Sequence, residues 1–150
     1  MKKTEELFNK WNKEKKKIDF DWNPNKIVKV WEIWIIKIWM NIWWENSKNN
    51  DFTRPALVIS NNLWWDLIWI IPFTSSFNKN FKKYYFLLEN SSKYWLEKES
   101  NLLLNQFKVI SKKRFLYKIN NLSTINKNKR LVWRNILEII NKKLKKVFKI

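Results

Sequence analysis

The sequence predicts a small, mainly β domain with a helix at each end, which places it in the α+β class. Three observations support this class. Short β-rich segments separated by polar loops fill the middle of the chain, helical periodicity marks both ends, and 150 residues is one domain's length. We therefore expect an N-terminal helical extension over residues 1–26, followed by a barrel domain with its C-terminal helix over 27–150.

The first helix is expected over residues 4–18. Leu7, Trp11 and Ile18 recur there at helical spacing, with lysines between them. The polar stretch 19–26, which contains an Asn-Pro pair, is expected to link this helix to the β region.

The β region is predicted to be a small meandering barrel or sandwich, because its apolar segments are short and evenly interrupted. The expected strands are 28–38, 55–60, 67–73, 83–88, 103–110 and 114–119, and the expected loops are 41–53, 75–82 and 89–101. Beyond Ser123, a candidate N-cap, apolar residues at periods of three and four predict a helix that covers the barrel.

The charge balance points to an anionic partner. The chain has 31 Lys and Arg against 13 Asp and Glu, a formal charge of +18, which suits a polyanion or an acidic protein. A solvated basic surface is the plainer alternative. No apolar run reaches the ~18 uninterrupted residues of a membrane span, and the N-terminus lacks a signal-peptide pattern, so we expect a cytoplasmic protein.

The absence of Cys and His excludes several chemistries for this chain. Disulfides, Cys nucleophiles, Ser-His-Asp triads and zinc sites with nitrogen or sulfur ligands all require residues that it lacks. Catalysis would have to use Arg, Lys, carboxylates, hydroxyl groups or the backbone. We expect no cofactor.

Glycine is absent while tryptophan occurs 12 times. Average usage predicts about ten glycines in a chain of this length, and a barrel needs turn positions with φ > 0, which glycine adopts without strain. Our hypothesis is that many of these tryptophans are UGA codons that the source organism reads as glycine. The codons of Trp31, Trp39 and Trp43 test it, because UGG at all three would end the idea.

Five segments, in this order, resemble the MazF/PemK family of toxins. They are Val30–Trp34, Asn41–Glu45, Thr53–Ile59, Ile71–Ser75 and Leu103–Ile110. They are similar to the family's Gly-Asp/Glu-Ile-Trp strand, a loop, an Arg-Pro-x-Leu-Val-Ile strand, a Pro-Leu/Ile-Thr-Ser strand end and a Leu-x-x-Gln-Ile-Arg strand. Trp31, Trp39 and Trp43 fall where relatives usually carry Gly, which agrees with the recoding hypothesis.

The resemblance implies the toxin of a type II toxin-antitoxin system. It implies an SH3-like antiparallel β-barrel of the MazF/CcdB type, and an endoribonuclease (mRNA interferase) that cleaves single-stranded RNA without a metal ion. The implied partners are an acidic antitoxin protein, a second copy in a homodimer, and operator DNA bound through the antitoxin complex. No membrane partner is implied.

The candidate site follows from the chemistry of RNA and from these motifs. RNA can be cut by its own 2′-OH, so the protein must position the strand, move protons and stabilise charge. Arg54 would stabilise the phosphoryl group, Thr74 would offer it a hydroxyl, and Glu45 would orient Arg54 or accept the 2′-OH proton. The expected RNA contacts are Lys48, Ser75, Lys79, Lys82, Lys83, Gln106 and Lys108.

Each motif also has a plainer interpretation. Arg54 opens a strand after a turn, Thr74 suits a cap, Gln106 suits a backbone contact and Glu45 suits an ion pair with a lysine. Aromatic residues near the loops would stack on bases or, more simply, pack in the core; they are Trp64, Trp65, Tyr84 and Tyr85.

Two other functions stay open at this point. One is a barrel of the same fold that binds RNA or DNA without cutting it. The other is a basic membrane-surface protein that acts through the lysine-rich C-terminal run 142–149. Against the latter, the apolar face of residues 132–147 is needed to cover the barrel.

Overall fold

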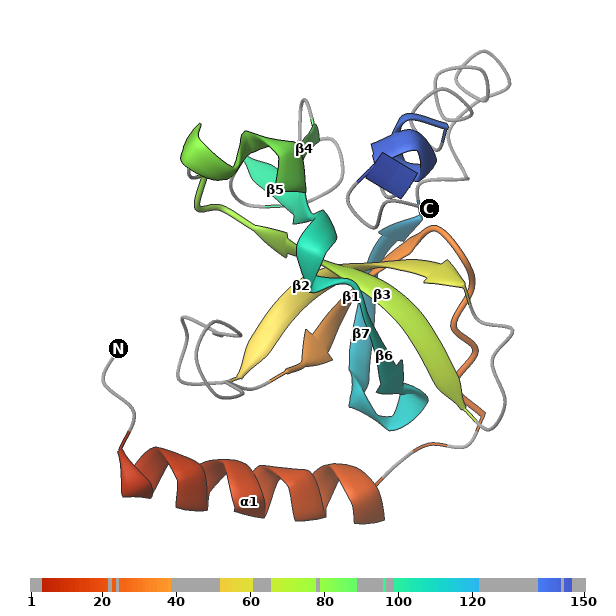
Figure 1. The fold of residues 1–150 in the computed structure, drawn as a ribbon. Coiled ribbons are helices and arrows are strands. Elements are labelled where there is room, and N and C mark those ends of the chain that lie inside the picture. Colours follow the sequence, from red (N-terminus) through yellow and green to blue (C-terminus); the bar gives the residue numbers. More distant parts are fainter. Residues whose placement is uncertain are drawn as a thin grey trace.

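The computed structural model describes residues 4–21, 23, 25–38, 52–60, 66–77, 79–88, 96, 99–121, 138–143 and 145–146. Its elements are α1 (Glu5–Phe20), β1 (Glu32–Lys37), β2 (Thr53–Ser60), β3 (Leu67–Thr74), the 3-10 helix η1 (Lys79–Tyr84), β4 (Tyr85–Leu88), β5 (Ser100–Leu103), η3 (Leu104–Gln106), β6 (Lys108–Ser111), η4 (Lys112–Arg114) and β7 (Phe115–Asn121). Helix α1 lies at one end of the molecule, and helical residues 138–143 and 145–146 lie at the other (Figure 1). The expected class, a mainly β domain with a helix at each end, is confirmed.

The seven strands form one antiparallel, strongly bent sheet. The strand order is β4-β5-β3-β2-β1-β7, with β6 also paired to β3. Strand β3 is the centre of this arrangement because it pairs with β2, with β6 through its first half, and with β5 through its last two residues. Within the described residues no ladder joins β6 to β7, so the barrel is left open along that seam.

One expected strand is wrong. Residues 103–110 do not form a single strand, because the chain leaves β5 at Leu103, turns through η3 and starts β6 at Lys108. The turn was hidden in the sequence because Leu104, inside it, is fully buried and continues the apolar pattern. A second difference concerns residues 83–84, which belong to η1 and not to a strand.

Two clusters of buried side chains lie on opposite faces of the sheet, because successive residues of a strand point to opposite faces. The first contains Ile33, Leu57, Ile71, Phe73, Leu96, Leu102, Leu104 and Ile140. The second contains Val28, Trp34, Ile36, Ile38, Ala56, Val58, Ile68, Ile70, Ile110 and Phe115. Ile140 brings the described C-terminal helical residues onto the first cluster, and residues 122–137 of the expected closing helix lie outside the described residues.

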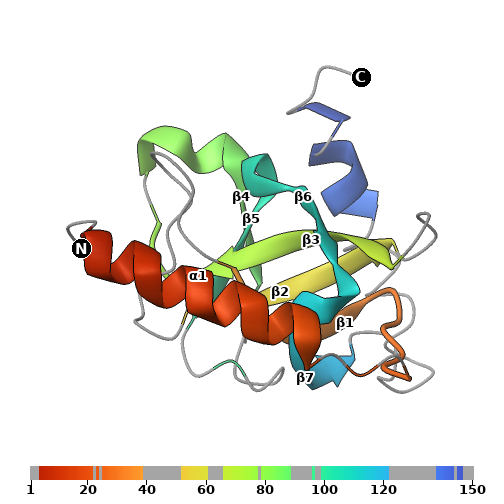
Figure 2. The ribbon, with the colours of Figure 1, turned by 90° about the horizontal axis from the view of Figure 1, so that it is seen from below.

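Helix α1 is held against the sheet by its buried Trp11. The Trp11 ring contacts Phe52, with ring centroids 5.3 Å apart, just before β2 begins. In the view from below, α1 runs across the strands (Figure 2). Two ion pairs farther along α1 join Glu14 to Lys37 at 2.8 Å and Asp19 to Lys113 at 2.5 Å. Neither α1 nor any other helix in the described residues is long and apolar enough to cross a membrane.

The two tryptophans at the start of β1 fit their positions differently. Trp34 is buried, its Nε1 donates a hydrogen bond to Glu32 at 2.8 Å, and its ring meets Phe115 edge-on at 5.7 Å. Trp31 has φ 69°, a backbone region in which glycine has no steric penalty. Phe52 adopts φ 56° with a buried side chain, so this fold also holds a bulky residue there. The recoding hypothesis therefore stays a prediction that the codons of residues 31, 39 and 43 test, and Trp39 and Trp43 lie outside the described residues.

Candidate active site

Arg54 lies near the start of β2, at the rim of the second core cluster. It shares a face of the sheet with Ala56 and Val58, whose side chains are fully buried. Burial lowers the pKa of Arg54, and nearby Tyr85 partly offsets this effect. The ordinary pKa of arginine is so high that the side chain keeps its charge at neutral pH.

Two hydrogen bonds fix the orientation of the Arg54 side chain. Its Nε donates to the Phe73 carbonyl oxygen at 2.5 Å, and its Nη1 donates to Gln106 Oε1 at 3.3 Å. The first partner belongs to the end of β3 and the second to η3. A guanidinium that is fixed before a ligand arrives is what charge stabilisation requires, because little reorganisation is then needed.

Thr74 ends β3, the strand that pairs with the strand of Arg54. Ala56 pairs with Pro72, and extending this register by two residues sets Arg54 opposite Thr74, with both side chains on one face of the sheet. Thr74 Oγ1 accepts a hydrogen bond from the Ser76 N–H at 3.2 Å. The plainer interpretation, a cap for the turn after β3, is therefore correct, and it is compatible with donation of the hydroxyl proton to a ligand.

Gln106 and Lys108 reach this region from the segment after β5. Gln106 is half-buried and contacts Arg54, so it helps to orient the arginine. Lys108 is half-buried in β6 and pairs with Ile70 of β3. Because side chains alternate along β3, Lys108 lies on the same face as Thr74.

The other candidate residues lie beyond the end of β3 or outside the described structure. Ser75 and the three lysines of η1 are exposed, and Lys83 Nζ lies 4.7 Å from the centre of the Tyr84 ring. The lysines of η1 are Lys79, Lys82 and Lys83. Glu45 and Lys48 lie outside the described residues and stay predictions. In the part of the chain that the structure describes, no three Asp, Glu, His or Cys side chains gather where they could hold a metal ion.

Sequence reasoning missed the aromatic residue Phe77 near this site and did not decide the role of a second one, Tyr85. Phe77 was not singled out, and Tyr85 was weighed only between core packing and base stacking. The rings of Phe77 and Tyr85 contact each other with centroids 5.2 Å apart. The sequence did offer a signal for Phe77, because this aromatic residue stands between Ser, Asn and Lys residues in a polar segment.

Comparison with known proteins identifies a matching family and a solved structure of similar fold. A family described as PemK-like, MazF-like toxin of type II toxin-antitoxin system matches residues 29–148. Among solved structures, the chain is similar to Mycobacterium tuberculosis toxin MazF-mt6, with a TM-score of 0.53 and 11% sequence identity over 79% of this chain and 97% of that one. At this identity the likeness concerns the fold. No curated protein sequence matches the chain, and α1 precedes the residues that the family covers.

Proposed function

We propose that this chain, which belongs to the family of PemK-like, MazF-like toxins of type II toxin-antitoxin systems, cleaves single-stranded RNA by directing a ribose 2′-OH at the adjacent phosphate. The observation that carries the proposal is the setting of Arg54. Its guanidinium is held by Phe73 and Gln106, on the same face of the sheet as the Thr74 hydroxyl. The chain around it has a formal charge of +18.

In the proposed reaction the 2′ oxygen bonds to phosphorus and the bond to the 5′ oxygen breaks. A proton leaves the 2′-OH, another reaches the departing 5′ oxygen, and the products are a 2′,3′-cyclic phosphate and a 5′-OH. Arg54 donates hydrogen bonds to the non-bridging oxygens as their negative charge grows, and Thr74 donates to the same group. Glu45, as proposed from the sequence, would orient Arg54 or accept the 2′-OH proton.

The exposed lysines beyond β3 supply the sequence-independent part of RNA binding. Lys79, Lys82 and Lys83 follow Thr74 within ten residues and lie on one short helix. Ser75, which follows Thr74, and Lys108, which lies opposite Ile70 on β3, add further contacts, and Lys48 is a contact proposed from the sequence. Since phosphate contacts release counterions, RNA affinity should fall steeply with salt.

The same basic surface suits the acidic segment of an antitoxin. An Asp- and Glu-rich chain would cover the lysines and exclude RNA, with an association rate that falls as salt rises. We propose this protein partner, a homodimer, and operator DNA reached through the antitoxin complex. A short acidic protein encoded by a neighbouring gene would support the antitoxin as partner.

A cleavage assay tests the function. Purified protein should cut a defined single-stranded RNA in EDTA, and mass spectrometry should find 2′,3′-cyclic phosphate ends. A matched strand with a single 2′-deoxyribose at the cleaved position should stay intact, because the attacking hydroxyl is gone. RNA that is bound but never cut would favour the alternative, a barrel that binds nucleic acid without catalysis.

A further inference from the structure

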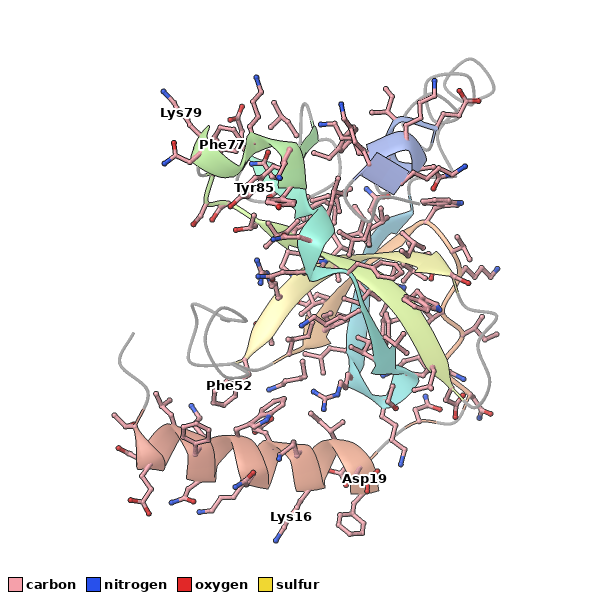
Figure 3. The ribbon with its side chains drawn as sticks, viewed as in Figure 1. Lys16, Asp19, Phe52, Phe77, Lys79 and Tyr85 are labelled. Carbon is pink, nitrogen blue, oxygen red and sulfur yellow. The ribbon has the colours of Figure 1, made fainter. Side chains whose placement is uncertain are left out.

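An aromatic pair, of which one ring is exposed, adjoins the basic 3-10 helix η1. Phe77 lies three residues beyond the end of β3, and Tyr85 opens β4. Their rings meet edge to face, with an interplanar angle of 72°. Phe77 is 47% exposed and Tyr85 is half-buried. Figure 3 shows both at the same corner of the molecule as Lys79, at the end opposite α1.

The sheet topology brings this pair close to Arg54. Tyr85 pairs with Leu103, the last residue of β5. Helix η3 starts at the next residue and carries Gln106, whose side chain contacts Arg54. The effect of Tyr85 on the pKa of Arg54, which opposes the lowering by burial, fits the same proximity. Phe77 lies on the chain that leaves Thr74, three residues beyond the end of β3.

The chemistry of the patch suits an unpaired base. A phenylalanine that is almost half exposed does little for the core, whereas an aromatic face at the surface stacks on any base. The lysines of η1 are exposed beside it and can neutralise the phosphates on either side of that base. Stacking plus backbone charge is the combination by which proteins hold single strands.

We propose that Phe77 and Tyr85 form a stacking site for one unpaired base next to the phosphate bound at Arg54. The inference rests on the proposed function for the identity of the strand as RNA. It adds a reason for selecting single strands, because a base inside a duplex is already stacked and cannot reach the site.

Equilibrium binding of a strand that cannot be cut tests the site. The probe is a fluorescent oligonucleotide with a 2′-O-methyl group on every ribose, measured by anisotropy in EDTA. Phe77→Leu should bind it at least about fivefold more weakly than the unaltered protein, since one stacked base contributes on the order of 1–3 kcal/mol. Phe20→Leu is the matched control: Phe20 is 82% exposed at the end of α1, and its loss should leave affinity unchanged.

Oligonucleotides that each lack one base then distinguish the loss of base stacking from a general loss of binding affinity. Removing one base at a time from the probe should reduce affinity for the unaltered protein most strongly at one position, and Phe77→Leu should lose that dependence. Tyr85→Leu should behave in the same way. Equal affinities of Phe77→Leu and Phe20→Leu, or an abasic profile that survives Phe77→Leu, would overturn the site.

The two proposals fail in different ways. The probe reports binding alone, so a protein that shows the abasic profile but cuts no RNA retains the base site and loses the nuclease assignment. A protein that cuts RNA while Phe77→Leu binds the probe normally retains the nuclease assignment and loses the base site.

Discussion

Two partly buried arginines serve different parts of this domain. Arg54 contacts polar groups at the end of β3 and in η3. Arg114, in η4, lies beneath α1, where its guanidinium carbon is 5.5 Å from the centre of the Trp11 ring and its Nη1 donates a hydrogen bond to the Lys37 carbonyl oxygen at 3.4 Å. Burial lowers the pKa of both side chains. A shifted pKa therefore reports burial here and does not by itself identify a catalytic arginine.

The neighbours of each arginine distinguish the two regions. Arg54 has a threonine hydroxyl opposite it and exposed lysines beyond it, which is a setting for an anion. Arg114 contacts an indole ring and donates a hydrogen bond to a backbone carbonyl, so its described interactions are made within the protein. We infer that Arg114 fixes α1 to the sheet and that Arg54 acts on the substrate.

The largest expected effect on stability comes from Arg114→Ala. Losing the contact with Trp11 and the bond to Lys37 should lower the free energy of unfolding by about 2 kcal/mol, as measured by urea denaturation. RNA cleavage by the folded fraction should stay near that of the unaltered protein. Arg54→Ala, in contrast, should reduce RNA cleavage by the folded protein, because its guanidinium lies at the candidate active site. The reverse pattern would show that the two roles are exchanged.

A smaller effect, on rate, is expected from Thr74→Val. The change keeps the shape but removes the hydroxyl, so single-turnover cleavage should slow about tenfold, the worth of one hydrogen bond to a charged group. Thr74→Ser should restore most of the rate. Unfolding curves of both variants control for the lost cap on Ser76. A valine variant as fast as the serine variant would remove Thr74 from the site.

The smallest effect concerns the pH dependence of the α1 contact. The hydrogen bond from Lys37, more than any other cause, lowers the pKa of Glu14 from its ordinary value of 4.5. A carboxylate whose pKa is lower in the folded protein stabilises the fold at pH values above its pKa in the unfolded chain. This contribution is lost as the pH falls through its pKa in the folded protein. Glu14→Gln should therefore lower stability at pH 6 by roughly 0.5 kcal/mol.

That difference should vanish at a pH below the folded pKa of Glu14, while RNA cleavage at pH 6 is unaffected. Urea denaturation of both proteins across this range measures it. A difference that persists unchanged in acid would mean that Glu14 acts through packing and not through its charge.

The fold was largely predictable because short apolar segments separated by polar loops mark the strands that form the core. Strands β2 and β3 were expected at 55–60 and 67–73 and lie at Thr53–Ser60 and Leu67–Thr74. The break between β5 and β6 was not predictable, because a buried leucine inside the turn preserves the apolar pattern.

The candidate site was less predictable than the fold. Composition indicated only an anionic partner, and Arg54 and Thr74 came from the family resemblance. The contact between Arg54 and Gln106 joins residues that are 52 positions apart. It depends on how β2, β3 and β5 are aligned, which local sequence patterns do not specify. The approach of Tyr85 to the segment that carries Gln106 was hidden for the same reason, because it depends on how β4 pairs with β5.

The central claim is that Arg54 stabilises the charge that develops on the phosphate. Its most direct test is the single-turnover cleavage rate of Arg54→Ala in EDTA, measured beside Arg114→Ala and Arg54→Lys with saturating RNA. We predict a loss of about 100- to 1,000-fold for Arg54→Ala, comparable to removing one transition-state donor, an intermediate loss for Arg54→Lys and none for folded Arg114→Ala. An Arg54→Ala protein that cuts RNA as fast as the unaltered one would contradict the claim.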